Sequence, residues 1–108
     1  MGFQVGSALL DACVLSVLRQ GDTYGYVLTQ TLRNVLGVSE STLYPVLKRL
    51  QRDGFLTVYD QPYQGRNRRY YTITKKGIEQ ADIYRRDWVI YRNNVDTFVC
   101  GGGNDEQS

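Results

Sequence analysis

Hydroxyl-bearing and basic side chains are concentrated in residues 39–52, a segment whose apolar residues have helical spacing. Leucine and valine recur there at intervals of three and four residues, which predicts a helix that buries one face and is capped by Ser39. The face left outside the core would carry Ser41, Thr42, Tyr44, Lys48, Arg49 and Arg52. Such groups form hydrogen bonds and ion pairs with phosphates and base edges, so this face is typical of a helix that binds DNA.

A second basic cluster begins at the end of residues 60–67, a segment rich in turn formers that we expect to form the loop between two strands. Leu56 to Tyr59 alternate as a half-buried strand does, and Tyr71 and Ile73 can pair with them in a hairpin. The tip and second strand of this hairpin would carry Arg66, Asn67, Arg68, Arg69 and Tyr70. Guanidinium groups bind phosphate bidentately and enter narrow minor grooves, so the hairpin could contact the DNA backbone beside the helix. A charged hairpin that only prevents edge-to-edge aggregation is the alternative interpretation.

The charge of the 108-residue chain is unevenly distributed, although the net value is only +2. Residues 40–76 carry eight basic and three acidic side chains, a net charge of +5, and the remaining residues carry a net −3. A segregated field of this kind steers a polyanion to one face of a protein. Charge alone is equally compatible with a solvated surface.

The composition argues against catalysis and metal binding. Histidine is absent, which removes the commonest general base and the commonest metal ligand. Cys13 and Cys100 have neither the spacing of a zinc site nor the density of a disulfide scaffold. With no paired carboxylates, activated nucleophile or phosphate-binding loop, we expect no enzymatic activity, no cofactor and no metal. No apolar run approaches the ~18 residues needed to span a bilayer, so we expect no membrane association and a cytoplasmic location.

Three helices must position the basic groups. Apolar periodicity predicts a first helix from Ser7 to about Gln20. The same periodicity predicts a second helix that is capped by Asp22 or Thr23. Pro45 must lie near the start of the third helix, where we expect a distorted first turn. The predicted fold is mostly α with a small β-hairpin wing, that is, a winged helix-turn-helix followed by a long C-terminal helix.

A long final helix is predicted after Thr74, with apolar residues at a spacing close to that of a coiled-coil seam. These residues are Ile78, Ala81, Tyr84, Trp88, Tyr91, Val95 and Phe98. About 24 residues at ~1.5 Å rise would extend ~36 Å, too far for the outer half to pack on a body of this size. We expect two-fold pairing with a second copy that also involves Leu10 and Val14 of the first helix. A helix that folds back on its own domain is the alternative.

These elements divide the chain into three parts. Residues 1–74 would form the DNA-binding domain, residues 75–99 the dimerisation helix, and residues 100–108 a disordered tail with nothing to bury. Gly77 lies early in the final helix, where glycine costs up to about 1 kcal/mol relative to alanine. Its presence there indicates close packing against the wing or the second helix.

Four short motifs, which together span residues 9–80, resemble those of a known family. They are Tyr24-Gly25-Tyr26, Ser41-Thr42-Leu43-Tyr44-Pro45 with the helix that follows, the basic segment from Gly65 to Tyr71, and Thr74-Lys75-Lys76-Gly77. In this order and spacing they resemble the PadR-type winged-helix transcriptional regulators of bacteria. The resemblance implies a homodimer that binds palindromic promoter DNA, usually as a repressor. The short single C-terminal helix resembles that of the smaller subgroup.

One departure and one further similarity concern individual residues. Ser41 lies where the family often has glycine, and it would provide either an extra contact or a better helix start. In some small members a tryptophan of the last helix lines a pore between the subunits and stacks flat aromatic drugs. Trp88 is similar in position and is flanked by Tyr84, Asp87 and Tyr91, so the resemblance implies a candidate ligand site. The alternative is that Trp88 only fills the dimer seam.

The sequence therefore predicts a sequence-specific DNA-binding transcriptional regulator. The resemblance implies a homodimeric repressor on a palindromic promoter site, with a planar aromatic ligand at the dimer interface as its candidate effector. Its two recognition helices would enter successive major grooves, ~34 Å apart. The alternative is a winged-helix interaction module whose basic face binds an acidic protein surface instead of double-stranded DNA.

Overall fold

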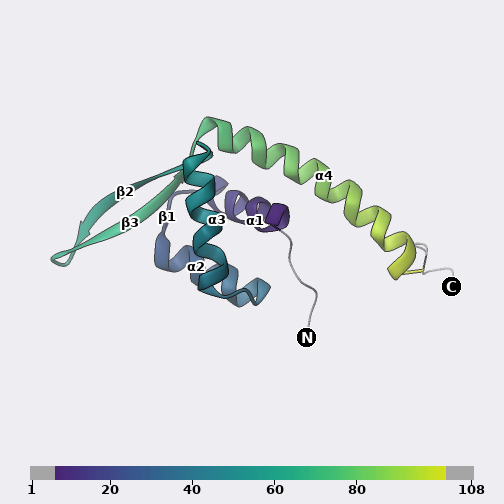
Figure 1. Ribbon diagram of the computed structural model, residues 1–108, viewed down its shortest axis with the longest axis horizontal. Coiled ribbons are helices and arrows are strands. Elements are labelled where there is room, and N and C mark those ends of the chain that lie inside the picture. Colours follow the sequence, from purple (N-terminus) through teal and green to yellow (C-terminus); the bar gives the residue numbers. More distant parts are fainter. Residues whose placement is uncertain (1–6, 102–108) are drawn as a thin grey trace.

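Four helices and a three-stranded antiparallel sheet make up the computed structural model, which describes residues 7–101 (Figure 1). Along the chain they are α1 (Ser7–Arg19), β1 (Thr23–Tyr24), α2 (Gly25–Leu36), α3 (Glu40–Arg52), β2 (Leu56–Tyr63), β3 (Arg66–Ile73) and α4 (Lys75–Val99). This order confirms the predicted fold class, mostly α with a hairpin wing and a long last helix. Most of the predicted tail, residues 102–108, lies outside the described residues.

The hydrophobic core lies between α1, α2 and α3, and the first part of α4 packs against it. Each helix contributes one apolar face at the spacing that the sequence shows. The buried residues are Leu10, Val14, Leu15, Leu18, Leu28, Leu32, Leu43, Val46, Leu47, Leu50, Leu56 and Ala81. Because four of them belong to α3, the face of that helix toward the core is fixed and the opposite face is left to solvent.

The first turn of α3 has the cap that the sequence predicts. The Ser39 side-chain oxygen accepts a hydrogen bond from the backbone N–H of Thr42 at 3.2 Å. The carbonyl oxygen of Ser39 also accepts from the N–H groups of Thr42 and Leu43, both at 3.1 Å, a shared bond that tightens the turn. Pro45 lies inside the helix and has no N–H to donate to the carbonyl of Ser41.

The wing is a regular hairpin rather than two short strands joined by a long loop. Residues 56–63 of β2 pair with residues 66–73 of β3 along their whole length. Gln64 and Gly65 form the turn with positive φ values of 52° and 80°, which a two-residue type I′ turn requires. The prediction of a loop over residues 60–67 is therefore wrong. Pro62 fits within β2 because this strand is at the edge of the sheet, whose order is β1-β3-β2.

The predicted start of the second helix is also wrong, since Thr23 and Tyr24 form the short strand β1. They pair with Tyr71 and Tyr70 of β3. Helix α2 then begins at Gly25, with Tyr24 at the N-cap position and no side-chain capping bond. A Cβ atom on Gly25 would lie only 3.0 Å from the ring of Tyr71, so α2 starts directly against the wing. Two residues offer too little periodicity for a strand to be detected from sequence.

The start of α4 is fixed against the base of the wing. The Thr74 hydroxyl accepts a hydrogen bond from the N–H of Gly77 at 3.0 Å and donates one to the carbonyl of Gly54 at 2.7 Å. A Cβ atom on Gly77 would collide with the carbonyl oxygen of Phe55 and lie 2.6 Å from the Cγ1 atom of Ile73. This confirms the close packing that the sequence predicts for Gly77 and identifies the wing as the neighbour.

The outer half of α4 projects from the rest of the protein, on the side away from the hairpin (Figure 1). The radius of gyration is 16.4 Å, compared with the ~13 Å expected of a compact chain of this length. The outer half has large apolar side chains that are mostly exposed, including Tyr91 at 62% and Phe98 at 85%. A soluble protein seldom leaves such side chains together in water.

We expect Gly77→Ala to lower the free energy of unfolding by about 1–3 kcal/mol, because the new methyl group meets backbone that cannot move aside. Urea unfolding followed by circular dichroism measures this change. Glu79→Ala, at an exposed position on the same helix, is the matched control and should change stability by less than about 0.5 kcal/mol. Equal stability of the two variants would contradict the packing assigned to Gly77.

Candidate nucleic-acid interface

The outer face of α3 presents several of the predicted DNA-binding residues to solvent. Ser41, Thr42, Tyr44 and Lys48 are all exposed. The Ser39 hydroxyl also lies 3.0 Å from each of the Ser41 and Thr42 hydroxyls, so the three form a connected polar cluster at the helix start. These side chains can donate and accept hydrogen bonds, as base edges and phosphates require.

Arg49 differs from the other basic residues of α3. Its guanidinium donates to both carboxylate oxygens of Asp11 on α1, at 2.9 and 2.6 Å. The Asp11 side chain is 7% exposed and that of Arg49 is 32% exposed. The hydrogen bond with Asp11 raises the pKa of Arg49 further above its ordinary value. Because this pair ties α3 to α1 inside the fold, we do not include Arg49 in the proposed DNA interface.

Arg52 lies at the C-terminal end of α3 and pairs with the neighbouring Asp53 at 3.0 Å. The side chain of Arg52 is 71% exposed, and its hydrogen bond is the main reason why the pKa of Asp53 is lowered. An ion pair this exposed contributes little to stability. Arg52 can therefore exchange Asp53 for a phosphate at small cost.

The wing places its arginines on two different faces. Because side chains alternate along a strand, Arg66, Arg68 and Tyr70 share one face of β3, and Arg69 and Tyr71 share the other. Sequence alone grouped Arg66, Arg68 and Arg69 as one basic cluster. The strand register divides them.

Arg68 is held between two tyrosine rings. Its guanidinium carbon lies 3.7 Å from the ring centroid of Tyr63 and 4.4 Å from that of Tyr24. Tyr70, next to it on the same face, stacks on Tyr59 at 5.5 Å with 10° between the rings. Cation–π contacts of this kind favour one position of the guanidinium while leaving its N–H edge available. Sequence reasoning missed this tyrosine cluster, although residues 59, 63 and 70 fall on one face once the hairpin register is known.

The other face of the wing is directed toward the helices. Arg69 lies 3.4 Å from Asp60 across the hairpin, and both side chains are about half exposed. Tyr71 packs against the core, and burial is the main reason why its pKa is raised, with Arg69 acting in the opposite direction. The hydroxyl of Tyr44 on α3 contributes to this rise as well. Helix α3 also contacts strand β2 of the wing.

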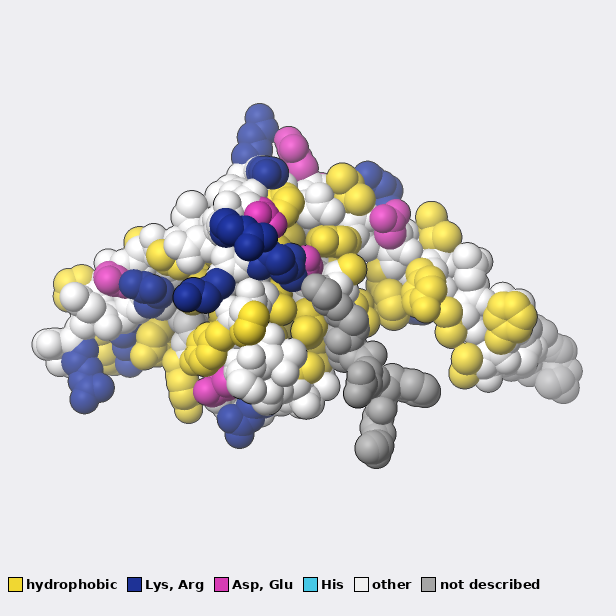
Figure 2. All heavy atoms as spheres, viewed as in Figure 1, with side chains coloured by type: hydrophobic (Ala, Val, Ile, Leu, Met, Phe, Trp, Pro, Cys, Tyr) yellow, Lys and Arg dark blue, Asp and Glu magenta, His cyan; other side chains and the backbone are white. Residues whose placement is uncertain are grey.

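Lysine and arginine side chains gather over α3 and the wing, whereas the outer half of α4 shows mainly apolar side chains on the same view (Figure 2). Exposed members of the basic set are Lys48, Arg52, Arg66 and Arg69. Asn67 at the hairpin end is exposed as well. The structure thus brings the two clusters predicted from sequence to one region of the molecule.

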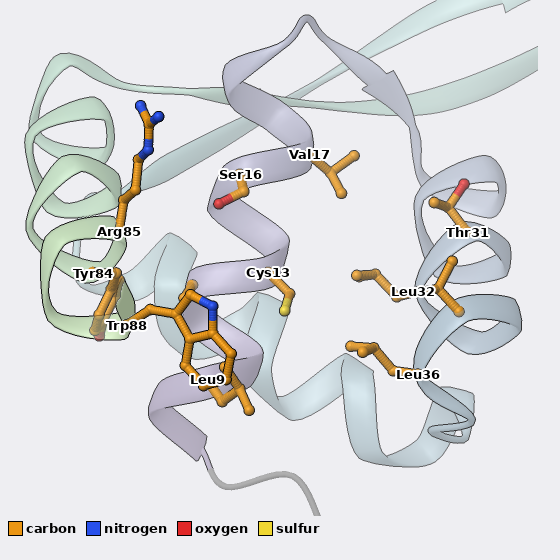
Figure 3. A pocket seen from close by; sticks show the side chains of 12 residues that line it. Leu9, Cys13, Ser16, Val17, Thr31, Leu32, Leu36, Tyr84, Arg85 and Trp88 are labelled. Carbon is orange, nitrogen blue, oxygen red and sulfur yellow. The ribbon is translucent and has the colours of Figure 1, made fainter. Parts of the chain in front are cut away.

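An apolar groove of about 490 Å³ lies between α1, α2 and α4 (Figure 3). Trp88 and Tyr84 line it from α4, and Cys13 lines it from α1. Burial raises the pKa of the Tyr84 hydroxyl and of the Cys13 thiol. Of the four residues predicted for a ligand, Asp87 and Tyr91 are not part of the lining. Arg85 of α4 lines the groove as well. The other walls come from α1 and α2, which sequence reasoning did not assign to this site: Leu9, Ala12, Ser16, Val17, Thr31, Leu32, Val35 and Leu36.

The residues predicted for a dimer interface fall into two groups. Leu10, Val14 and Ala81 are buried in the core of the single chain and are not available to a partner. The residues that remain at least partly accessible are Ile78, Tyr84, Trp88, Tyr91, Val95 and Phe98. The ring centroids of Trp88 and Tyr91 are 6.3 Å apart.

Metal and membrane sites are not found in the part of the chain that the structure describes. Within residues 7–101, no cluster of three or more acidic or cysteine side chains is arranged to hold a metal ion. None of the helices described is sufficiently long and apolar to cross a bilayer.

Three helices, a wing and an exposed polar face on the third helix define a winged helix-turn-helix protein of the DNA-binding class. Residues 14–82 match the family described as the PadR-like transcriptional regulators. The chain belongs to this family. Its members are transcriptional regulators that bind DNA.

Individual relatives agree with this assignment. The chain is 32% identical over 88 residues to the negative transcriptional regulator PadR of Bacillus subtilis, a match that covers 76% of this chain and 46% of that protein. It therefore spans about half the length of that relative. A crystal structure of a Streptococcus mutans protein has a TM-score of 0.85 and 36% identity, with 94% of this chain and 95% of the other covered. A PadR family regulator from Clostridium difficile has a TM-score of 0.76 and 26% identity, with 83% and 97% covered.

Replacing Arg66 and Arg68 together by glutamine should weaken binding to every duplex. The slope of log K against log salt should become shallower by about one unit for each phosphate that the variant no longer neutralises. Fluorescence anisotropy of a labelled duplex at salt concentrations between about 50 and 200 mM gives both the affinity and the slope. Arg92→Gln is the control: it also replaces an arginine by glutamine, but on the outer half of α4, outside the proposed DNA interface. A slope unchanged by the double substitution would refute the wing assignment.

Proposed function

We propose that the protein is a homodimeric, sequence-specific repressor that binds a palindromic promoter site. The observation that carries this proposal is the convergence of the polar face of α3 and the basic wing on one region of the surface (Figure 2). A two-fold dimer presents two such regions, so each half-site would lie one helical turn, ~34 Å, from the other. The name of the B. subtilis relative, a negative regulator, supports repression.

The proposed contacts divide into two kinds. The hydroxyls at the start of α3, with Tyr44 and Lys48, would contact bases and provide sequence preference. The wing would contact the flanking backbone or minor groove through Arg66, Arg68 and Arg69, and provide most of the affinity. Arg68 would enter with little loss of freedom because its two tyrosine neighbours already position it.

The second copy is the proposed occupant of the apolar groove and the partner of the outer half of α4. Phe98 and Val99 are 85% and 74% exposed, and the groove wall is almost entirely apolar. The exposed apolar stripe of α4 and the apolar groove are complementary surfaces on the same chain. Two-fold pairing would bury both at once.

The proposed effector is a planar aromatic molecule stacked on Trp88. Trp88 is 40% exposed and lies beside Tyr91, so its ring has an open surface in the single chain. Such a ligand can relieve repression only if it binds better to a dimer whose recognition helices no longer match the groove spacing. If the second copy fills this space completely, Trp88 only packs in the dimer interface and binds no ligand.

The rival function is an interaction module that binds an acidic protein surface with the same basic face. Binding of random duplex DNA distinguishes the two. A DNA-binding protein should bind it measurably at low salt and lose affinity steeply as salt is added. Indifference to DNA, together with a protein that co-purifies, would favour the module. Footprinting on the promoter upstream of the coding sequence then tests site symmetry and autoregulation.

Placing a charge on the outer half of α4 should separate the subunits. We expect Phe98→Glu to convert the dimer to a monomer in sedimentation equilibrium and to reduce operator affinity by at least about tenfold, because one half-site is lost. The substitution should not unfold the chain, since Phe98 is 85% exposed within it. Thr97→Glu places the same charge one residue earlier, turned by about 100° around the helix, and should remain dimeric. Identical masses for both variants and the parent would contradict the interface.

Titration with acridine, a planar tricyclic compound, should quench or shift the emission of Trp88, the one tryptophan of the chain. We expect saturation at micromolar concentrations if the ring stacks on the indole. The same titration of N-acetyltryptophanamide corrects for light absorbed by the compound. An emission change no larger than that of this control, for acridine and related compounds, would rule out the effector site.

A further inference from the structure

Asp11 is the one buried acidic residue in the part of the chain that the structure describes, with 5% of its surface exposed. It lies on α1 and is surrounded by the helices that pack against it. A carboxylate removed from water in this way must be compensated by donors of good geometry. Loss of a donor would leave this buried carboxylate uncompensated, so its hydrogen-bond partners are strongly favoured in their positions.

Two other helices supply these partners. Arg49 of α3 donates from its two terminal nitrogens to the two oxygens of Asp11, at 2.9 and 2.6 Å. Tyr84 of α4 donates its hydroxyl proton to Oδ2 of Asp11 at 3.4 Å. One carboxylate thus connects α1, the recognition helix and the long C-terminal helix. The two arginine bonds are short and charge-assisted, whereas the tyrosine bond is long and is the member most easily changed.

Tyr84 also belongs to the apolar groove. Its ring lines the wall beside Trp88, one helical turn further along α4 (Figure 3). The same side chain therefore faces the groove with its ring and contacts Asp11 with its hydroxyl. A change in what fills the groove, or in the position of α4, can therefore act on this hydroxyl through the ring.

We propose that Asp11 and Tyr84 are positioning residues that make the placement of α3 depend on the filling of the α1–α2–α4 groove. This inference rests on the proposed function and names the way in which the groove and the DNA-binding face influence each other. When Tyr84 donates, Oδ2 of Asp11 is shared between two donors. When Tyr84 does not donate, Arg49 is the donor that remains to Oδ2 of Asp11. The guanidinium of Arg49, and α3 with it, can then shift toward Oδ2.

Thermodynamic coupling is reciprocal, which makes the proposal testable without an effector. If groove filling biases α3, then DNA bound to α3 must alter the groove. Trp88 reports on the groove directly because it lines the wall and is the one tryptophan of the chain. Its emission can be followed while duplex DNA is added, and anisotropy of a labelled duplex measures binding independently.

In the unaltered protein, saturation with duplex should change the emission of Trp88. Tyr84→Phe keeps the ring in the groove wall and removes only the hydroxyl. It should still bind duplex, with affinity lowered by less than about tenfold, and lose at least half of the emission change. Arg49→Lys keeps the charge and removes the two-pronged contact, and should have the same effect. Because both substitutions act on one network, the double variant should lose little more than either single variant.

Tyr91→Phe is the matched control. Tyr91 lies on the same helix, 6.3 Å from Trp88 between ring centroids, and its hydroxyl makes no hydrogen bond within the described residues. This variant should keep the full emission change. A purely structural role for Tyr84 would lower stability and leave the DNA-induced change of emission intact.

Several results would overturn the proposal. They are an unaltered protein whose Trp88 emission does not respond to saturating duplex, a Tyr84→Phe variant with the full response, or equal losses in Tyr84→Phe and Tyr91→Phe. In each of these cases the anisotropy still shows binding, so the proposed function stands. If anisotropy shows no binding of duplex by the unaltered protein, the proposed function fails and the inference fails with it.

Discussion

Burial of the apolar face of α3 is the constraint on which the rest of the structure depends. Four side chains of this helix, spaced by three and four residues, must lie in the core, so its rotation about its own axis is fixed. The cap at Ser39 fixes where the helix begins. With both fixed, the hydroxyls and Lys48 must face outward, and the wing, which continues from the end of the helix, can only project beside them.

The basic side chains differ in how strongly their neighbours hold them in place, and this difference gives them different roles. Arg49 is joined to a buried carboxylate and belongs to the framework of the fold. Arg68 is held by two aromatic rings with its edge accessible, and Arg69 is balanced by Asp60 across the hairpin. Arg66 at the end of the wing is exposed. The net charge of +2 does not reveal this arrangement, because a polyanion interacts with the local distribution of charge on the surface.

The helices and the cap of α3 could be predicted from sequence because they depend on local periodicity and on capping chemistry. The failures are non-local. The sequence near Arg49 does not identify its hydrogen-bond partner, since Asp11 is 38 residues away. The strand at Thr23 and Tyr24 exists only because β3 lies beside it, and the length of the hairpin depends on positive φ values at the turn. Leu10 and Val14 show the same limit, because an apolar stripe does not say whether its own chain or a partner covers it.

The central claim is that α3 and the wing of two subunits form one symmetric DNA-binding surface. Selection of bound duplexes from a pool of random sequence tests it most directly, because the pool assumes no target. The account predicts an enriched inverted repeat whose half-site centres lie about 10 base pairs apart, with protection of the flanking backbone where the wings contact it. Enrichment of a single unrepeated site, or no enrichment at salt concentrations where duplex is still bound, would contradict it.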